Sequence, residues 1–229
     1  MNRNPGWIVG LIVAMIVVAA ALGFYFATIT VASGVSVSTS TTTQTVFSSN
    51  STSASPYVLT LAITTNNLYN STVGDQPAFF VVGQNGLESS ANISLPAHRL
   101  IKLVIVNYDD GAANLTSPQY ANVTGTLNNV ISIVNNGNVN SSQGSSGIRV
   151  TGGETVSSLP ADNVSHTFTV PQLNLNIPIL PSSIVTAYFT LNQTGTFTWL
   201  CSTECGSGPT GIQGAMSTRG WMTGSLTVS

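Results

Sequence analysis

The sequence is poor in charged residues and has only two cysteines and two histidines. Asp, Glu, Lys and Arg make up 5% of its 229 residues, where a typical soluble chain carries ~25%. Five Lys and Arg against seven Asp and Glu give a formal net charge of −2, so the chain lacks the positive field that nucleic-acid binding needs. Disorder throughout is also excluded, because 42% of the residues are hydrophobic and can bury a core. We therefore expect a folded protein with no nucleic-acid partner.

One long apolar run stands near the N-terminus. From Trp7 to Ala27 there are 21 residues without a charge, which as a helix span ~31 Å, about one hydrocarbon core. A cleaved secretory signal usually has a shorter apolar region, so residues 1–32 are interpreted as a retained transmembrane anchor. Arg3 is the one cation beside this run, and the positive-inside rule leaves the N-terminus in the cytoplasm. The prediction is a single-pass cell-membrane protein whose C-terminal part is extracytoplasmic.

The segment that follows the anchor is rich in hydroxyl side chains. Residues 33–56 contain 15 Ser or Thr out of 24 and no charge, a composition typical of a flexible linker. Eight Asn-X-Ser/Thr sequons are candidates for glycosylation in an exported chain. They begin at Asn50, Asn70, Asn92, Asn114, Asn122, Asn140, Asn163 and Asn192. Few charges, many uncharged polar groups and attached sugars would suit the surface of an archaeal-type acidophile.

From residue 57 onward the sequence predicts strands and turns. Short runs of β-branched and aromatic residues are bounded by Gly, Pro and Asn, and no helical period is found after the anchor. The expected strands are 57–63, 78–82, 100–106, 167–170, 185–191, 196–200 and 225–228. This pattern predicts an all-β sandwich over residues 57–229. Residues 109–162 are looser in composition and are interpreted as an insertion, in which 130–134 belongs to a hairpin.

Three segments carry side chains that bind soft metal ions. Cys201–Gly206 (CSTECG) places two thiols four residues apart, directly after a predicted strand. His166–Pro171 (HTFTVP) places an imidazole at the start of an earlier strand, and Trp221–Val228 (WMTGSLTV) places Met222 just before the last one. These positions can converge at one end of a sandwich.

The three segments resemble the cupredoxin domain of subunit II of heme-copper terminal oxidases. In that family a His opens one strand, and a Cys-x3-Cys-Gly loop with a later His and Met supplies the other side-chain ligands. The resemblance covers roughly residues 90–228, interrupted by the insertion, and implies a cupredoxin-like Greek-key β-sandwich. The ligands that it implies are His166, Cys201, Cys205 and Met222, with copper as the cofactor. A single N-terminal transmembrane helix also fits the single-span members of the family.

The family's second histidine is missing here. Pro209 stands four residues after the second cysteine, Arg219 stands three before Met222, and neither can supply an imidazole. The other histidine, His98, precedes the strand at 100–106 and should lie ~25–30 Å from the ligand loop if the cupredoxin topology holds. One imidazole, two thiols and a thioether still form a soft ligand set that selects copper. Met216 is a competing thioether.

A disulfide between Cys201 and Cys205 is the alternative to copper. An external compartment is oxidising, and three intervening residues permit a bridge if the Cα atoms come within ~7 Å. So small a loop would add little chain-entropy stabilisation. Both interpretations stay open at this point, and His166 can equally be a hydrogen-bonded structural residue.

Enzymatic sites find little support in the sequence. Asp109-Asp110-Gly111 follows a predicted strand, and Asp-Gly is a common turn dipeptide. Neither histidine has the spacing of a Ser-His-acid set. A hydrolase is therefore disfavoured, and a non-catalytic subunit is expected rather than an enzyme by itself.

Two classes of function remain. The first is a membrane-anchored electron-transfer or structural subunit II of a respiratory terminal oxidase, with the oxidase subunits as partners. It would receive electrons from a small external redox protein or belong to a quinol-fed complex. Loss of the second imidazole favours the quinol type or an altered copper site. The second class is a glycosylated cell-surface or filament β-sandwich protein with a Cys201–Cys205 disulfide and no metal.

Overall fold

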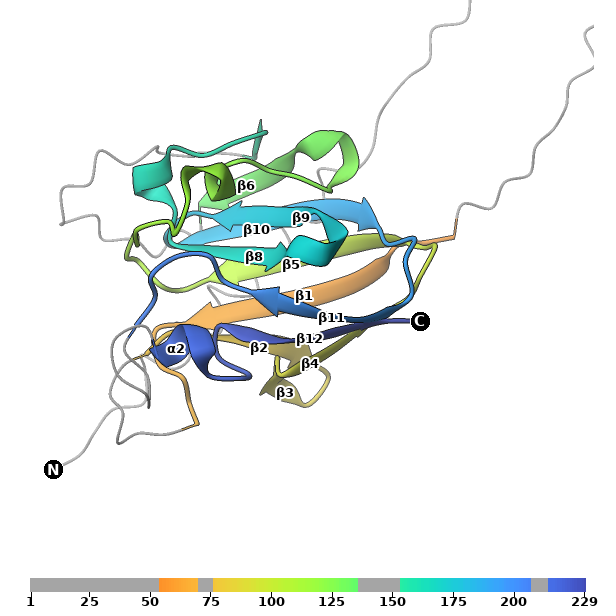
Figure 1. Cartoon of the computed structure of the whole chain (residues 1–229), viewed down its shortest axis with the longest axis horizontal. Coiled ribbons are helices and arrows are strands. Elements are labelled where there is room, and N and C mark those ends of the chain that lie inside the picture. Colours follow the sequence, from red (N-terminus) through yellow and green to blue (C-terminus); the bar gives the residue numbers. More distant parts are fainter. Residues whose placement is uncertain (1–53, 70–75, 136–152, 207–213) are drawn as a thin grey trace, which may run out of the picture. The chain divides into compact units, whose positions relative to one another are not determined.

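The computed structural model describes residues 54–69, 76–135, 153–206 and 214–229. These residues form two β-sheets whose inner faces enclose one hydrophobic core (Figure 1). The strand order is β3-β2-β1-β5-β10-β6-β7 in the larger sheet and β4-β12-β11-β8-β9 in the smaller one. The predicted β-sandwich is confirmed, and it is consistent with a cupredoxin fold.

The larger sheet is mixed. Its strands are β1 (Tyr57–Thr64), β2 (Ala78–Gly83), β3 (Gly86–Ser89), β5 (Leu100–Asn107), β6 (Ile131–Asn135), β7 (Glu154–Val156) and β10 (Ser183–Thr190). β1 and β5 are parallel, and the other neighbours are antiparallel. Along β5 the side chains of Ile101, Leu103 and Ile105 are buried, while those between them are half-buried. This period of two is what a sheet with one face on the core requires.

In the smaller sheet, two neighbouring strands are covered on both of their faces. Its strands are β4 (Asn92–Leu95), β8 (His166–Val170), β9 (Leu175–Ile179), β11 (Gly195–Leu200) and β12 (Thr223–Val228). Every residue of β8 and β9 is buried. The Asn176 amide of β9 donates to the carbonyl oxygens of Tyr120 and Asn122 at 3.0 and 2.6 Å. The chain between β5 and β6 therefore lies over the outer side of these strands.

Short helical turns complete the described part. They are η2 (Pro118–Ala121), η3 (Leu127–Asn129), η4 (Ala161–Asn163), η5 (Pro171–Leu173) and α2 (Gly214–Ser217). None of the helices in the described ranges is long and apolar enough to cross a membrane.

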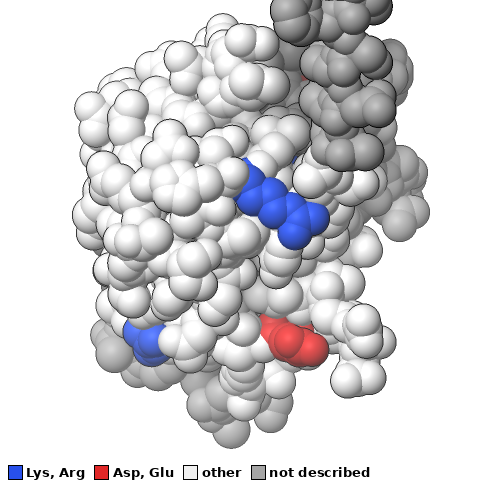
Figure 2. Space-filling view, turned by 90° about the vertical axis from the view of Figure 1, so that its right-hand side faces the viewer, with Lys and Arg blue, Asp and Glu red and all other residues white. Residues whose placement is uncertain are grey.

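Aromatic side chains fill the centre of the core. The Trp199 ring is fully buried and lies 5.3 Å from that of Phe79 and 5.6 Å from that of Phe168, between centroids. Its indole Nε1–H donates to the Ser90 carbonyl at 3.0 Å, which satisfies its one polar group. Charged side chains are few and far apart on the face drawn in Figure 2.

The seven expected strands and the strand-like run at 130–134 all occur, and their ends differ from the predicted ones by no more than about two residues. Four further strands, β3, β4, β7 and β9, were not predicted. β9 contains Asn176 and Pro178, which weaken a strand pattern; Pro178 is tolerated because β9 is an edge strand. Within the predicted insertion, β6 pairs with β7, and it also pairs with β10 in the larger sheet.

Several of the sequence predictions concern residues that the structure does not describe. The predicted anchor at 1–32 and most of the predicted linker at 33–56 lie outside the described ranges. So do three of the sequons, at Asn50, Asn70 and Asn140. Of the other sequon residues, Asn92, Asn114, Asn122 and Asn192 are exposed and Asn163 is half-buried. Glycosylation stays a prediction.

Candidate metal centre

The ends of two neighbouring strands bring the predicted ligands together. His166 begins β8, and Cys201 follows the last residue of β11, which pairs with β8. The Thr167 backbone N–H points at Cys201 Sγ at 3.4 Å, and the Ser202 N–H donates to Thr167 Oγ1 at 2.7 Å. The loop after β11 therefore runs beside the start of β8. The imidazole and both thiols meet at one end of the sandwich.

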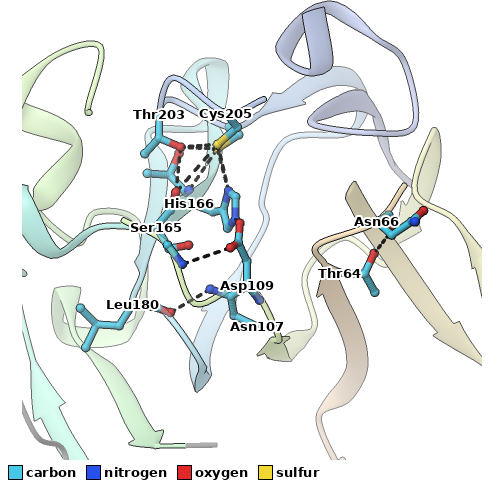
Figure 3. A network of polar contacts seen from close by, with 12 residues as sticks. Thr64, Asn66, Asn107, Asp109, Ser165, His166, Leu180, Thr203 and Cys205 are labelled. Atoms are coloured by element: carbon cyan, nitrogen blue, oxygen red, sulfur yellow. Dashed lines mark hydrogen bonds and ion pairs between the residues drawn. The ribbon is translucent and has the colours of Figure 1, made fainter. Parts of the chain in front are cut away.

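His166, Cys201 and Cys205 form a compact buried cluster, and Figure 3 shows the His166 ring beside the Cys205 sulfur. His166 Nδ1 lies 3.0 Å from Cys205 Sγ and 3.9 Å from Cys201 Sγ, and the two sulfur atoms are 3.6 Å apart. Both cysteines are free. Each of the three residues is no more than 3% exposed. Among the described residues, this is the one group of three His, Cys, Asp or Glu side chains that could hold a metal ion.

The spacing of these three atoms fits one metal ion. A triangle with sides of 3.0, 3.6 and 3.9 Å has a centre about 2 Å from each corner, close to the ~2.0–2.3 Å of metal–nitrogen and metal–sulfur bonds. An ion near that centre could bond to all three atoms with little movement of the chain. Two thiolates and an imidazole are soft or borderline ligands, which suit Cu(I) and other soft ions better than Mg²⁺ or Ca²⁺. The cluster can therefore bind copper.

Thr203 lies against both sulfur atoms. Its hydroxyl oxygen is 3.0 Å from Cys201 Sγ and 2.7 Å from Cys205 Sγ, and it donates to the Ser165 carbonyl at 3.0 Å. Thr203 is fully buried. A backbone bond from the Cys205 N–H to the Thr203 carbonyl, at 2.9 Å, closes the loop on itself. The loop is thus held in a shape that points both sulfurs inward.

Asp109 contacts the histidine from the side away from the thiols. Its Oδ2 lies 3.0 Å from His166 Nε2. Burial raises the pKa of the Asp109 carboxyl, but the hydrogen bond and charge of His166 outweigh burial and hold that pKa below its usual value. Burial likewise lowers the pKa of His166, and its bonds to Asp109 and Cys201 outweigh this effect and raise the pKa to about 9.

The pKa values of the two thiols are shifted in opposite directions. Burial alone would raise the pKa of Cys201, but hydrogen bonds with Cys205 and His166 and the charge of His166 hold it well below its ordinary value. The hydrogen bond to Cys201, with burial second, raises the pKa of Cys205. The site therefore pairs two groups with lowered pKa values, Asp109 and Cys201, with two groups with raised pKa values, His166 and Cys205.

A pocket of about 230 Å³ adjoins the cluster. Asp109, Ser165, His166, Glu204 and Cys205 are among its lining residues. The imidazole and one thiol thus lie directly beneath the protein surface.

Of the other residues considered in the sequence analysis, Met222 lies beside the cluster and His98 lies at the far end of the sandwich. Met222 is fully buried, and its carbonyl accepts a 2.8 Å bond from the Cys201 N–H, so its backbone is beside the site. Met222 as a thioether ligand stays a prediction. His98 is exposed and precedes the far end of β5, whereas Asp109 follows the near end. Arg219 donates to Asn92 Oδ1 at 2.6 Å, and Pro209 lies outside the described residues.

Two functional residues escaped the sequence analysis. Asp109 was interpreted only as part of a turn, and Thr203 was given no role within the CSTECG segment. The placement of His98 at the end of its strand far from the ligands already implied that Asp109, at the other end, would be near them. Thr203 offered no comparable signal, because hydroxyl residues are common in loops and abundant throughout this chain.

Comparisons with known proteins find only remote similarities. No protein-family model matches the sequence, and no curated protein matches it significantly. Among solved structures, the periplasmic domain of cytochrome oxidase subunit II from Bradyrhizobium japonicum is 15% identical and covers 75% of this chain and 83% of that one, with a TM-score of 0.32. A heme-copper terminal oxidase structure is 11% identical over 98% of this chain and 94% of that one, with a TM-score of 0.34.

A third match is auracyanin B, which is 16% identical over 76% of this chain and 91% of that one, with a TM-score of 0.31. The first two matches come from the oxidase family that the CSTECG and HTFTVP segments resemble.

Proposed function

We propose that this chain is a membrane-anchored electron-transfer subunit of a heme-copper terminal oxidase, with an altered site for one copper ion. The observation that carries the proposal is the placement of His166 Nδ1 and the two cysteine sulfurs around a point about 2 Å from each. When bound there, copper would accept and release one electron at a time. A metal-free structural subunit or a surface protein would have no need for this arrangement.

The surroundings of the cluster support this role. Phe79 lies edge-on to the His166 ring, with 6.2 Å between centroids, and helps to keep water from the buried side of the imidazole. The pocket reaches His166 and Cys205. A redox partner would dock over that pocket, because electrons would reach the ion there by the shortest route. Trp199 packs the core, as its two ring contacts indicate.

The remaining parts of the proposal rest on the sequence. The apolar run at 7–27 supports a single membrane span and an extracytoplasmic domain. The missing second imidazole supports a site for one ion rather than two. It also supports electron delivery within a quinol-fed complex rather than by a soluble carrier, and the terminal oxidase subunits would be the partners.

Copper stoichiometry tests the proposal. The full-length chain is purified in detergent, reduced, loaded with Cu(II) or Cu(I), freed of excess metal and assayed for copper and thiols. We expect one copper per chain and a thiolate-to-copper charge-transfer band in the oxidised form. Cys201→Ser and Cys205→Ser should each shift and weaken the band, and the double variant should lose it. A wild-type chain that takes up no copper after full reduction, and whose thiols are oxidised as isolated, would overturn the proposal.

Association with the oxidase is tested separately. Gentle solubilisation from the native membrane should bring the chain down with haem-bearing subunits, visible as a cytochrome spectrum. Copper binding without any haem partner would keep the metal site but overturn the assignment to an oxidase.

A further inference from the structure

Each ring nitrogen of His166 contacts a different group, and the two groups lie on opposite sides of the ring. Nδ1 faces the sulfurs, and Nε2 lies 3.0 Å from Asp109 Oδ2 (Figure 3). A neutral imidazole binds metal through one nitrogen while the other carries the proton. With Nε2–H donating to the carboxylate, the lone pair of the neutral ring is on Nδ1, where the ion would sit.

Asp109 is itself held in place by three hydrogen bonds. Its Oδ1 accepts the Gly111 N–H at 3.1 Å, its own N–H donates to Asn107 Oδ1 at 3.1 Å, and its carbonyl accepts the Ser182 N–H at 2.8 Å. Asn107 in turn donates to the Leu180 carbonyl at 2.9 Å. The carboxylate is therefore fixed in position before any ion arrives.

The carboxylate and the histidine come from different sheets. Asp109 follows β5 of the larger sheet, and His166 begins β8 of the smaller one. Asp109 has a side chain that is 21% exposed, against 2% for His166. The pair thus joins the two sheets at the rim of the pocket and brings a negative charge to the outer side of the imidazole.

We infer that Asp109 is a positioning residue for the copper site, which orients His166 and lowers the reduction potential of the bound ion. This inference rests on the proposed function. Carboxylates that hydrogen-bond a metal-bound histidine fix the ring and make it a stronger donor. A fixed negative charge near the site also stabilises the ion with the higher charge, so it favours Cu(II) over Cu(I). Loss of the charge should therefore raise the potential.

Three variants of the full-length chain separate these effects. Asp109→Asn removes the charge but keeps an acceptor oxygen of the same size. Asp109→Leu removes the charge and the acceptor. Asp110→Asn is the matched control, because Asp110 is the exposed neighbour and its loss changes the net charge equally.

Two measurements are made on each loaded protein. Redox titration of the charge-transfer band gives the potential, and competition with a chelator gives the affinity for Cu(I) and for Cu(II). We expect Asp109→Asn to weaken Cu(II) binding about tenfold more than Cu(I) binding, which raises the potential by ~59 mV for one electron. Asp109→Leu should lower copper affinity by ~10–100-fold. Asp110→Asn should match wild type.

The outcomes distinguish this inference from the proposal beneath it. If wild type and Asp110→Asn bind copper and Asp109→Asn has the same potential and affinities, the inference is wrong and the copper site stands. If wild type binds no copper, both fall. Asp109→Asn is isosteric, so it gives the decisive reading even if Asp109→Leu does not fold.

Discussion

The sulfur atoms of Cys201 and Cys205 lie 3.6 Å apart, and both residues are free thiols. A disulfide would need them at ~2.05 Å, whereas two ligands of one metal ion belong at a separation like the one observed. With His166 Nδ1 as the third corner, the loop after β11 holds a set of side chains that is arranged for an ion.

Replacement of Thr203 by Val should lower the reduction potential. In the loaded site both sulfurs are thiolates, and the Thr203 hydroxyl, 3.0 and 2.7 Å from them, can turn its one proton from the Ser165 carbonyl to a thiolate, which is the stronger acceptor. Without that donor the thiolates give more electron density to the ion and favour its oxidised form. The shift should be opposite in sign to that of Asp109→Asn and of similar size, up to ~59 mV for a tenfold change.

Redox titration of the charge-transfer band checks this shift. Thr116→Val is the control, because the Thr116 hydroxyl donates at 3.0 Å to the Ser202 carbonyl of the same loop rather than to a sulfur. The Thr203 variant should also lose about 1–3 kcal/mol of stability, since the buried Ser165 carbonyl loses its donor. A potential that rises, or that falls equally in both variants, would contradict the prediction.

The β-sandwich and the meeting of His166 with the two cysteines could both be predicted from the sequence. Strands such as β5 and β10 are rich in β-branched and aromatic residues, a signal that the order of residues in the sequence shows directly. His166 and Cys201 border strands that neighbour each other in the smaller sheet. Contacts that depend on the meeting of two sheets, such as that between Asp109 and His166, leave no local pattern in the sequence.

Met222 is the predicted thioether ligand, and Met216 provides a matched control. Met222 is fully buried beside Cys201, and Met216 is half-buried in α2. Met222→Leu keeps the volume of the side chain and removes the sulfur, so it should shift the charge-transfer band and raise or lower the potential measurably. Met216→Leu should leave both unchanged. Identical spectra for the two variants would remove Met222 from the ligand set.

Copper affinity should rise steeply with pH. His166, with a pKa raised to about 9, and Cys205, with a pKa raised above its ordinary value, must both lose protons before they can bind the ion. The lowered pKa of Cys201 makes its proton the easier of the two thiol protons to displace. Below pH 9 two protons therefore compete with copper, which makes the apparent affinity change by up to ~100-fold per pH unit.

Chelator competition between pH 6 and 9 measures this dependence. The direction follows from the two raised pKa values: protonation at lower pH closes the site, and deprotonation towards pH 9 opens it. An affinity that is flat or falls over this range would contradict the assignment of His166 and Cys205 as ligands.

Gly224 should not tolerate a side chain. A Cβ built there would lie 2.5 Å from Trp199 Nε1 and 2.8 Å from the Ser90 carbonyl oxygen, both parts of the packed core. Gly224→Ala should therefore cost about 1–3 kcal/mol of the free energy of unfolding. Gly153→Ala is the control, because the nearest side-chain atom to its Cβ would be 3.7 Å away. Urea unfolding compares the two, and equal stabilities would contradict the packing described around Trp199.

X-ray absorption at the copper edge tests the central claim most directly, because it identifies the atoms bound to the ion. For the loaded full-length chain, the account predicts two sulfur ligands at ~2.3 Å and one nitrogen ligand at ~2.0 Å, with one sulfur lost in Cys205→Ser. A first shell of nitrogen and oxygen alone, unchanged in Cys205→Ser, would contradict it.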